Sequence, residues 1–145
     1  MDELLERLYL EIANNDENCF NFIVACNQYF HDIDDIVDED KTGILIRMKT
    51  YADANNIFSS IYYQTYSGIL NPVIQMITSK YHLSVEYENG TIDWQKDEAN
   101  FLRSCGNDLL LVVAAIQHAG DYNKLFNISR KLSELSYTTQ RKVGE

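Results

Sequence analysis

The segment from His31 to Asp40 holds one histidine and six carboxylates and no basic residue. At about 100° per helical residue, His31, Asp34, Asp35 and Asp38 fall within an arc of roughly 100°. Oxygen ligands from clustered carboxylates are what Mg²⁺ and Mn²⁺ prefer, and a nearby imidazole adds a further ligand or a base. The spacing therefore indicates a divalent-cation site on one face of a helix.

The competing interpretation of this acidic segment is a solvated surface, and the sequence leaves it open. Two energetic costs of placing these carboxylates together argue that they serve a site. Carboxylates in the last turns of a helix oppose its dipole at about 0.3–1 kcal/mol each, and like charges at i,i+3 and i,i+4 repel one another. A face that served solubility alone would normally contain lysine, and this one does not.

A cation on one helix needs further ligands from a second helix or from water. Asp108 directly precedes the apolar run 109–116, where a carboxylate is costly to bury unless it is paired or ligating. Asp53 stands in otherwise apolar and aromatic surroundings at 51–58, near Asn55 and Asn56. We expect Asp108 and Asp53 both to face the acidic segment across a cleft. The alternatives are a salt bridge from Asp108 to Arg103 or Arg47, and a polar surface position for Asp53.

The chemistry that suits such a site is metal-assisted attack of water on a phosphate ester or anhydride, because the ion neutralises phosphate charge and generates the nucleophile. Asp34, Asp35 and Asp38 would hold the ion or its waters. His31 and Asp35 would be the catalytic groups, with His31 as ligand or general base. The predicted function is a Mg²⁺- or Mn²⁺-dependent hydrolase of a phosphorylated small molecule.

Composition bounds the class of protein. The chain has 145 residues and a formal net charge of −10 at pH 7, and 46% of its residues are hydrophobic. This length predicts a single domain, 1–145. The acidic balance argues against direct binding to nucleic acid or to an anionic membrane, since both need basic surface. Three cysteines without C-x-x-C spacing, and no basic signal-peptide region, indicate a cytoplasmic protein with reduced thiols.

Helical periodicity predicts a compact all-α bundle of five or six helices. Asn14 with Glu17 matches a capping box, Asn71-Pro72 matches a cap followed by proline at the first helical position, and Asp93 matches a further cap. Because the first part of the acidic helix is apolar nearly all round, its acidic end is expected to emerge from the core into a cleft. The expected helices are 2–13, 14 to about 41–43, 44–63 with a looser segment 64–70, 71–85, 93–118 and 121–136, before a polar tail at about 138–145.

Two resemblances bear on function. Asp34-Asp35-Ile-Val-Asp38 is similar to the D-D-x-x-D pattern with which helical isoprenoid synthases hold Mg²⁺ and diphosphate. Those enzymes are longer and have a second aspartate-rich helix, so this similarity is local and concerns shared chemistry alone.

The segments 31–38, 71–75 and 102–108 together resemble a group of small all-α bacteriophage-encoded proteins whose activity is unsettled. The resemblance implies a phage or prophage origin, a place in the host cytoplasm or the virion, and a role for His31, Asp34, Asp35, Asp38 and Asp108. It supports an alternative function: a non-catalytic phage accessory, inhibitor or virion-assembly protein, with homo-oligomers possible in that role, whose acidic helix contacts a basic phage or host partner.

Overall fold

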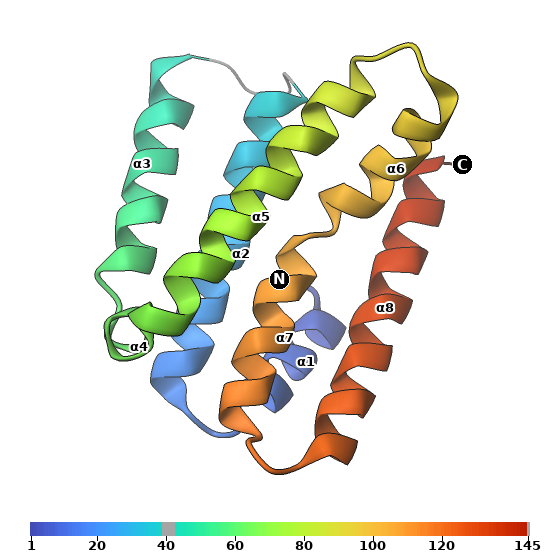
Figure 1. Ribbon diagram of the computed structural model, residues 1–145. Coiled ribbons are helices and arrows are strands. Elements are labelled where there is room, and N and C mark those ends of the chain that lie inside the picture. Colours follow the sequence, from blue (N-terminus) through green and yellow to red (C-terminus); the bar gives the residue numbers. More distant parts are fainter. Residues whose placement is uncertain (39–42, 145) are drawn as a thin grey trace.

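The computed structural model describes residues 1–38 and 43–144, with side chains as far as residue 136. Within these ranges the chain forms helices joined by turns, which confirms the all-α prediction (Figure 1). The helices are α1 (Glu3–Ala13), α2 (Glu17–Val37), α3 (Ile44–Phe58), α4 (Ile61–Thr65), α5 (Ser67–Glu88), α6 (Asp93–Arg103), α7 (Gly106–Gln117) and α8 (Tyr122–Gly144).

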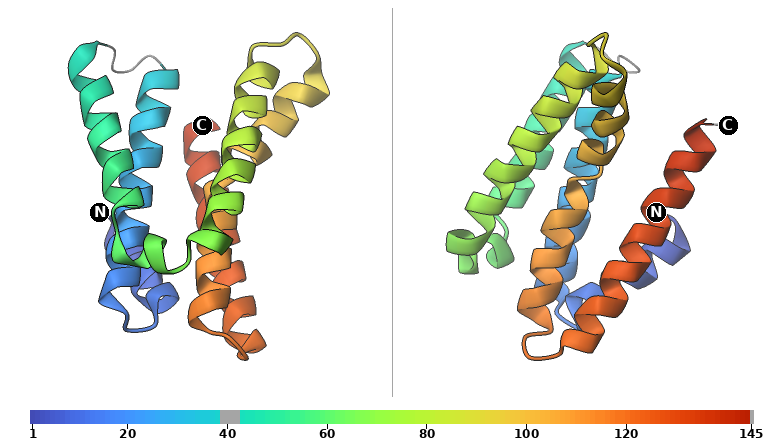
Figure 2. Two further views of the ribbon diagram at one scale, coloured as in Figure 1. Left: turned by 60° about the vertical axis from the view of Figure 1, so that its left-hand side comes forward. Right: turned by 45° about the vertical axis from the view of Figure 1, so that its right-hand side comes forward.

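The helices are arranged as two hairpins on a common base. α2 packs along α3, and α5 packs along α6, while α7 packs against α1, α5 and α8. Figure 2 shows the α2–α3 and α5–α6 pairs diverging toward the end at which α2 and α5 finish. The core lies at the other end, where fully buried apolar side chains from α1, α2, α7 and α8 meet: Ile12, Phe22, Ile23, Leu109, Val113 and Ile128.

The predicted capping box at the start of α2 is wrong. Asn14 instead ends α1 in the left-handed conformation, with a φ of 53°, and Asn15 follows with a φ of 66°. Asparagine tolerates this region better than most residues do, so the pair reverses the chain. Asp16 then caps α2, its Oδ1 accepting a hydrogen bond of 3.1 Å from the Cys19 amide.

Three other predicted boundaries are also wrong. The expected helix 44–63 is interrupted at Ser59–Ser60, because the Ser60 hydroxyl accepts from the Tyr63 amide at 3.1 Å and starts α4. Asn71-Pro72 lies inside α5 and does not start it. Proline has no amide hydrogen to donate to the carbonyl four residues back, which is that of Gly68. Because Gly68 is exposed, water can bond this carbonyl and the helix tolerates the proline. The last helix does not end near residue 136 but continues to Gly144. The predicted end of the acidic helix, 41–43, lies partly outside the described residues; α2 ends at Val37.

The stretch 93–117 is long and apolar enough, by length and composition, to cross a membrane. The sequence predicts one helix here with Asp93 as its cap, and both predictions are wrong. Ile92 is the cap residue instead, and the stretch divides at Ser104–Cys105, where the amides of both residues bond three residues back, at 3.2 and 3.1 Å. The second half, α7, contributes Leu109 and Val113 to the core described above.

Gly106 begins α7 against an aromatic ring of α2. A Cβ atom at this position would lie 3.3 Å from the Phe30 ring, whereas one at Gly68 in α5 would meet nothing within 4 Å. A side chain at Gly106 would therefore require the Phe30 ring to move by a few tenths of an ångström.

We predict opposite effects for alanine at these two helical glycines. Gly68→Ala should raise the free energy of unfolding by about 0.5–1 kcal/mol, because alanine favours helix. Gly106→Ala should lower it by about 1 kcal/mol, because the gain in helix propensity is outweighed by displacement of Phe30. Urea unfolding followed by circular dichroism measures both, and equal effects of the two substitutions would contradict this account of the α2–α7 contact.

Candidate binding groove

The acidic end of α2 meets an arginine from α6. The Arg103 guanidinium lies 3.5 Å from Asp38 and 4.0 Å from Asp34. It also pairs with Glu88 at the end of α5, and its Nε donates to the Ser84 hydroxyl at 3.0 Å. The structure therefore brings Asp34 and Asp38 together, as the sequence predicted, and places a guanidinium between them.

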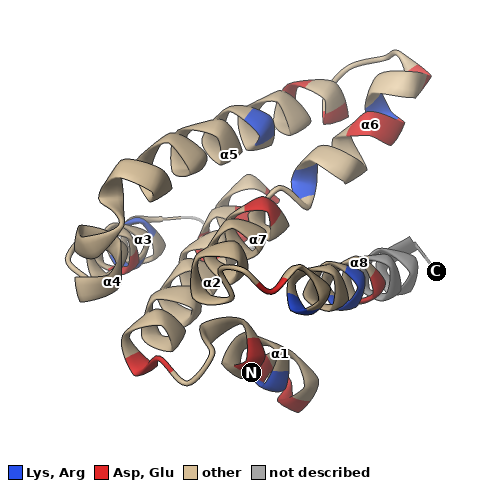
Figure 3. Cartoon of the chain, turned by 60° about the horizontal axis from the view of Figure 1, so that its bottom comes forward, with Lys and Arg blue, Asp and Glu red and all other residues tan. Residues whose placement is uncertain are grey.

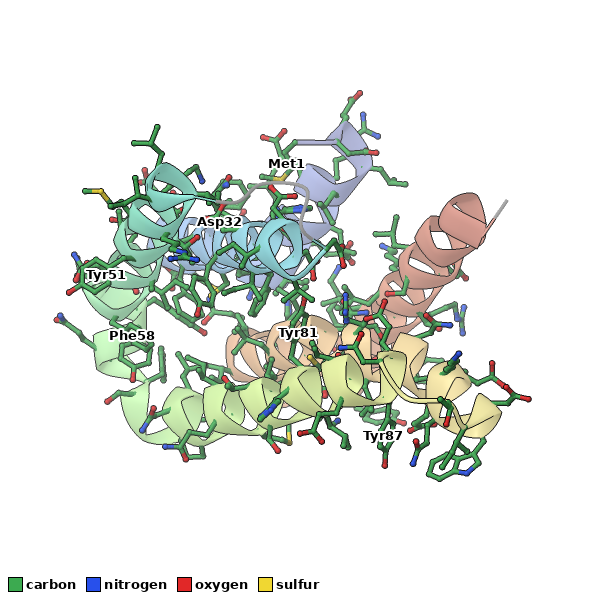
Figure 4. The ribbon with its side chains drawn as sticks, turned by 90° about the horizontal axis from the view of Figure 1, so that it is seen from above. Met1, Asp32, Tyr51, Phe58, Tyr81 and Tyr87 are labelled. Carbon is green, nitrogen blue, oxygen red and sulfur yellow. The ribbon has the colours of Figure 1, made fainter. Side chains whose placement is uncertain are left out.

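Tyr81 completes this group. Its hydroxyl donates to the Asp34 carboxylate, and its ring lies 5.0 Å below the Arg103 guanidinium carbon. Burial, followed by the hydrogen bond to Asp34, raises the pKa of Tyr81 well above its usual range, so the phenol stays neutral. Figure 4 shows Tyr81 reaching from α5 toward α2. We call Asp34, Asp38, Tyr81, Glu88 and Arg103 the rim cluster.

The other predicted site residues lie elsewhere. Asp108 pairs with Lys80 of α5 at 2.8 Å, and Asp53 pairs with Lys49 at 2.7 Å. His31 is exposed, and Asp35 is partly buried one residue from Asp34. Among the described residues, no group of three or more histidines, cysteines, aspartates or glutamates stands ready to hold a metal ion. The divalent-cation site and the hydrolase chemistry built on it remain predictions.

Beneath the rim cluster lies an apolar cavity of about 240 Å³ between α2, α5 and the α6–α7 junction. A second cavity of about 140 Å³ continues from it toward α3. The two cavities share four lining residues, Tyr29, Phe30, Ile77 and Thr78, and we call the pair the α2–α5 groove. The other apolar or aromatic residues of its lining include Ile33, Ala54, Ile57, Phe58, Ile74 and Leu109.

The sequence does not single out Tyr81 or Glu88, and it offers Arg103 only as a possible partner of Asp108, which pairs with Lys80 instead. The sequence signal that could have identified Arg103 as part of the site is its isolation, because it is the single basic residue in segment 97–108, which also contains acidic residues. Pairing it with α2 requires knowing that the α5–α6 hairpin folds back over the end of that helix. Cys105 lines the groove as well, and burial raises the pKa of its thiol to about 11, so it is unreactive at neutral pH.

Asp32 is a further residue that sequence reasoning missed. It lies two residues before Asp34, about 160° around α2 on the opposite side, and is 2% exposed. Its Oδ1 accepts from Lys49 of α3 at 2.9 Å and from Gln28 at 3.2 Å, while its Oδ2 has no hydrogen-bond partner among the described residues. Burial opposes ionisation of Asp32, yet interactions with Asp53, Lys49 and Gln28 together lower its pKa.

A cavity of about 530 Å³ lies away from these carboxylates, between α1 and α8. Two of its charged lining residues pair across it, with the Lys131 ammonium 2.8 Å from Glu11. Lys131 and Lys124 lower the pKa of Glu11 against the effect of burial. Figure 3 shows acidic and basic residues interspersed on these two helices, whereas the end of α5 is acidic. The end of α2 carries Asp34, Asp35 and Asp38. The electrostatic character of the α1–α8 cavity is therefore mixed, unlike that of the rim cluster.

Comparisons of this chain with protein-family models, with curated proteins and with solved structures find no match.

We predict that Lys49→Met lowers the free energy of unfolding by about 2–3 kcal/mol at pH 7, because it leaves the buried Asp32 carboxylate without its ammonium partner. The Lys49 side chain is half exposed, so the effect should be smaller than for a fully buried ion pair. The matched control, Lys96→Met on the surface of α6, should change it by less than about 0.5 kcal/mol.

The destabilisation caused by Lys49→Met should depend on pH. Because the pKa of Asp32 is lowered in the folded state, its contribution is complete above about pH 4 and is lost as pH falls further. The stability gap between Lys49→Met and the unsubstituted protein should therefore narrow in acid. Urea titrations between neutral pH and pH 3 measure it, and a gap that is constant across this range would show that Asp32 is not the partner that matters.

Proposed function

We propose that this protein is a non-catalytic binding protein whose α2–α5 groove receives a basic amphipathic helix of a partner protein. The observation that carries the proposal is the pairing of an apolar groove with a rim that has more acids than bases. In the rim cluster, the three carboxylates of Asp34, Asp38 and Glu88 surround the single guanidinium of Arg103.

The rim is reachable from outside. The carboxylate side chains of Asp34, Asp38 and Glu88 are each about half exposed, whereas Arg103 is mostly buried between them. With one positive charge among three negative ones, the cluster has a formal charge of −2. A lysine or arginine on a partner would relieve this repulsion, and opposite charges across an interface also speed association. The acidic chain as a whole attracts a basic partner in the same way.

The dimensions of the groove favour side-chain anchors over a free small molecule. Each cavity, at about 240 and 140 Å³, is smaller than the roughly 300–1,000 Å³ of a site for a drug-sized molecule, and only the two together reach the lower end of that range. Adjoining cavities of this size suit two apolar side chains from successive turns of one helix. Helices recognised in grooves use apolar anchors at such spacing and leave their polar face for the rim.

This proposal develops the alternative that the acidic segment contacts a basic partner. It assigns the contact to Asp34 and Asp38 and adds Glu88, which lies 50 residues further along the chain than Asp38. The hydrolase prediction has no comparable support, since Asp108 and Asp53 each pair with a different lysine.

Binding can be tested with two synthetic helical peptides that share leucine positions and differ in having lysine or glutamate at the polar positions. We expect the leucine–lysine peptide to bind more tightly, with affinity that falls as salt is raised, because salt screens the attraction to the rim. Fluorescence anisotropy of labelled peptide measures both effects. Equal binding of the two peptides would contradict the role of the rim.

The groove itself is tested by filling it. Thr78 is exposed and lines both cavities, so Thr78→Trp should weaken peptide binding at least about tenfold, or about 1.4 kcal/mol. The matched control is Thr65→Trp in α4, since both threonine hydroxyls donate to the carbonyl four residues back at 2.8 Å and Thr65 is also exposed. The control should leave affinity within about twofold. Unchanged binding by Thr78→Trp would place the peptide elsewhere.

A further inference from the structure

The outer face of α3 carries a row of exposed apolar side chains. Ile44, Leu45, Met48 and Tyr51 are 72, 80, 63 and 80% exposed, and we call these four the α3 patch. α3 lies at the edge of the molecule in Figure 1, and Figure 4 shows Tyr51 pointing outward from it. Contiguous exposure on this scale is unusual in a monomeric protein and marks an interaction surface.

The helix that bears the α3 patch packs its opposite side against the rest of the protein. Its inner side places Thr50 and Ile57 against the rest of the protein, and both are buried. A helix on the surface of a globular protein normally turns charged residues outward. Here the outer arc formed by the α3 patch is uncharged, and Arg47 and Lys49 lie on its two flanks.

We infer that a second copy of this chain covers the α3 patch, giving a dimer through antiparallel α3 helices. A two-fold axis brings the same patch of both copies face to face, and an uncharged patch meets itself without opposing like charges. Segment 44–52 holds two basic residues and no acid, in a chain whose net charge is −10. Lys49 on one flank is paired with Asp32 and Asp53 of its own chain, so its charge is largely neutralised and does not repel its two-fold mate.

The area of the patch is sufficient for a specific contact. Its four side chains and their flanks expose on the order of 700 Å² per copy, against about 800 Å² per partner in a standard interface. Pairing would place Met48 and Tyr51 near the axis and align α2, α3 and their two-fold mates as a four-helix layer. The α2–α5 groove is lined by Ala54, Ile57 and Phe58 of α3 and by none of the four patch residues, so it stays open in the dimer.

The dimer is tested by sedimentation equilibrium across a range of protein concentrations. We expect the unsubstituted protein to sediment as a dimer, and Met48→Glu to sediment as a monomer with an unchanged circular dichroism spectrum. Leu4→Glu is the matched control, because Leu4 is 59% exposed on α1 and outside the patch; it should remain a dimer. A monomeric unsubstituted protein at its highest soluble concentration would overturn the inference.

A cysteine at the patch provides a test that is independent of added charge. The native cysteines Cys19, Cys26 and Cys105 are buried, so they do not compete for oxidant. On mild oxidation Met48→Cys should form a disulfide-linked dimer within the time in which Leu4→Cys stays largely monomeric. Equal, slow cross-linking of the two variants would also overturn the inference. Failure of the dimer leaves peptide binding to the groove unaffected, and Met48→Glu should bind the leucine–lysine peptide normally.

Discussion

Arg103 holds the ends of the two hairpins together. Its guanidinium reaches carboxylates on α2 and on α5, and it lies above the ring of Tyr81, whose hydroxyl donates to α2 in turn. Close packing of helix against helix is concentrated within each hairpin and at the base. The polar contacts of Arg103 and Tyr81 therefore connect α2 with the α5–α6 hairpin at the end where the two hairpins diverge. The groove forms because α2 and α5 are joined at this end by side-chain contacts, which leave a space between the two helices. Its acidic character exists because one cation serves three anions.

The acidic segment behaves as two separate sites, because α2 lies between two neighbours. Asp32 faces α3 and is buried against Lys49, whereas Asp34 faces α5 and α6 and stays half exposed. A buried carboxylate needs a fixed partner, so Asp32 ties the α2–α3 hairpin together. The exposed carboxylates have water as an alternative partner and are available to another molecule. Asp32 thus stabilises the fold on one side of the helix, and we propose that Asp34 and Asp38 take part in recognition on the other.

Much of the fold follows from local pattern, and the errors have local causes. The apolar spacing in α1 and α2 predicts helices that the structure contains, and the spacing in 93–118 predicts helix but not the break at Ser104–Cys105. Asn71-Pro72 has the residues of a helix start, yet the preceding exposed glycine lets the helix begin earlier and run through the proline. Asn14 was misassigned because asparagine suits both a helix start and a left-handed helix end. Here Asp16 accepts the hydrogen bond from the Cys19 amide and starts α2, so Asn14 takes the role of helix end.

The sequence by itself determines that this protein is helical and acidic, and that Asp34 and Asp38 share a face near the end of a helix, because both properties depend on composition and on the fixed 3.6-residue period. The tertiary structure alone decides what those carboxylates meet. Arg103 lies 65 residues from Asp38 in the chain, and Lys80 lies 28 residues from Asp108. Such pairings depend on how the hairpins pack, which is set by the shapes of side chains in and around the core, such as the partly buried Phe30 against Gly106.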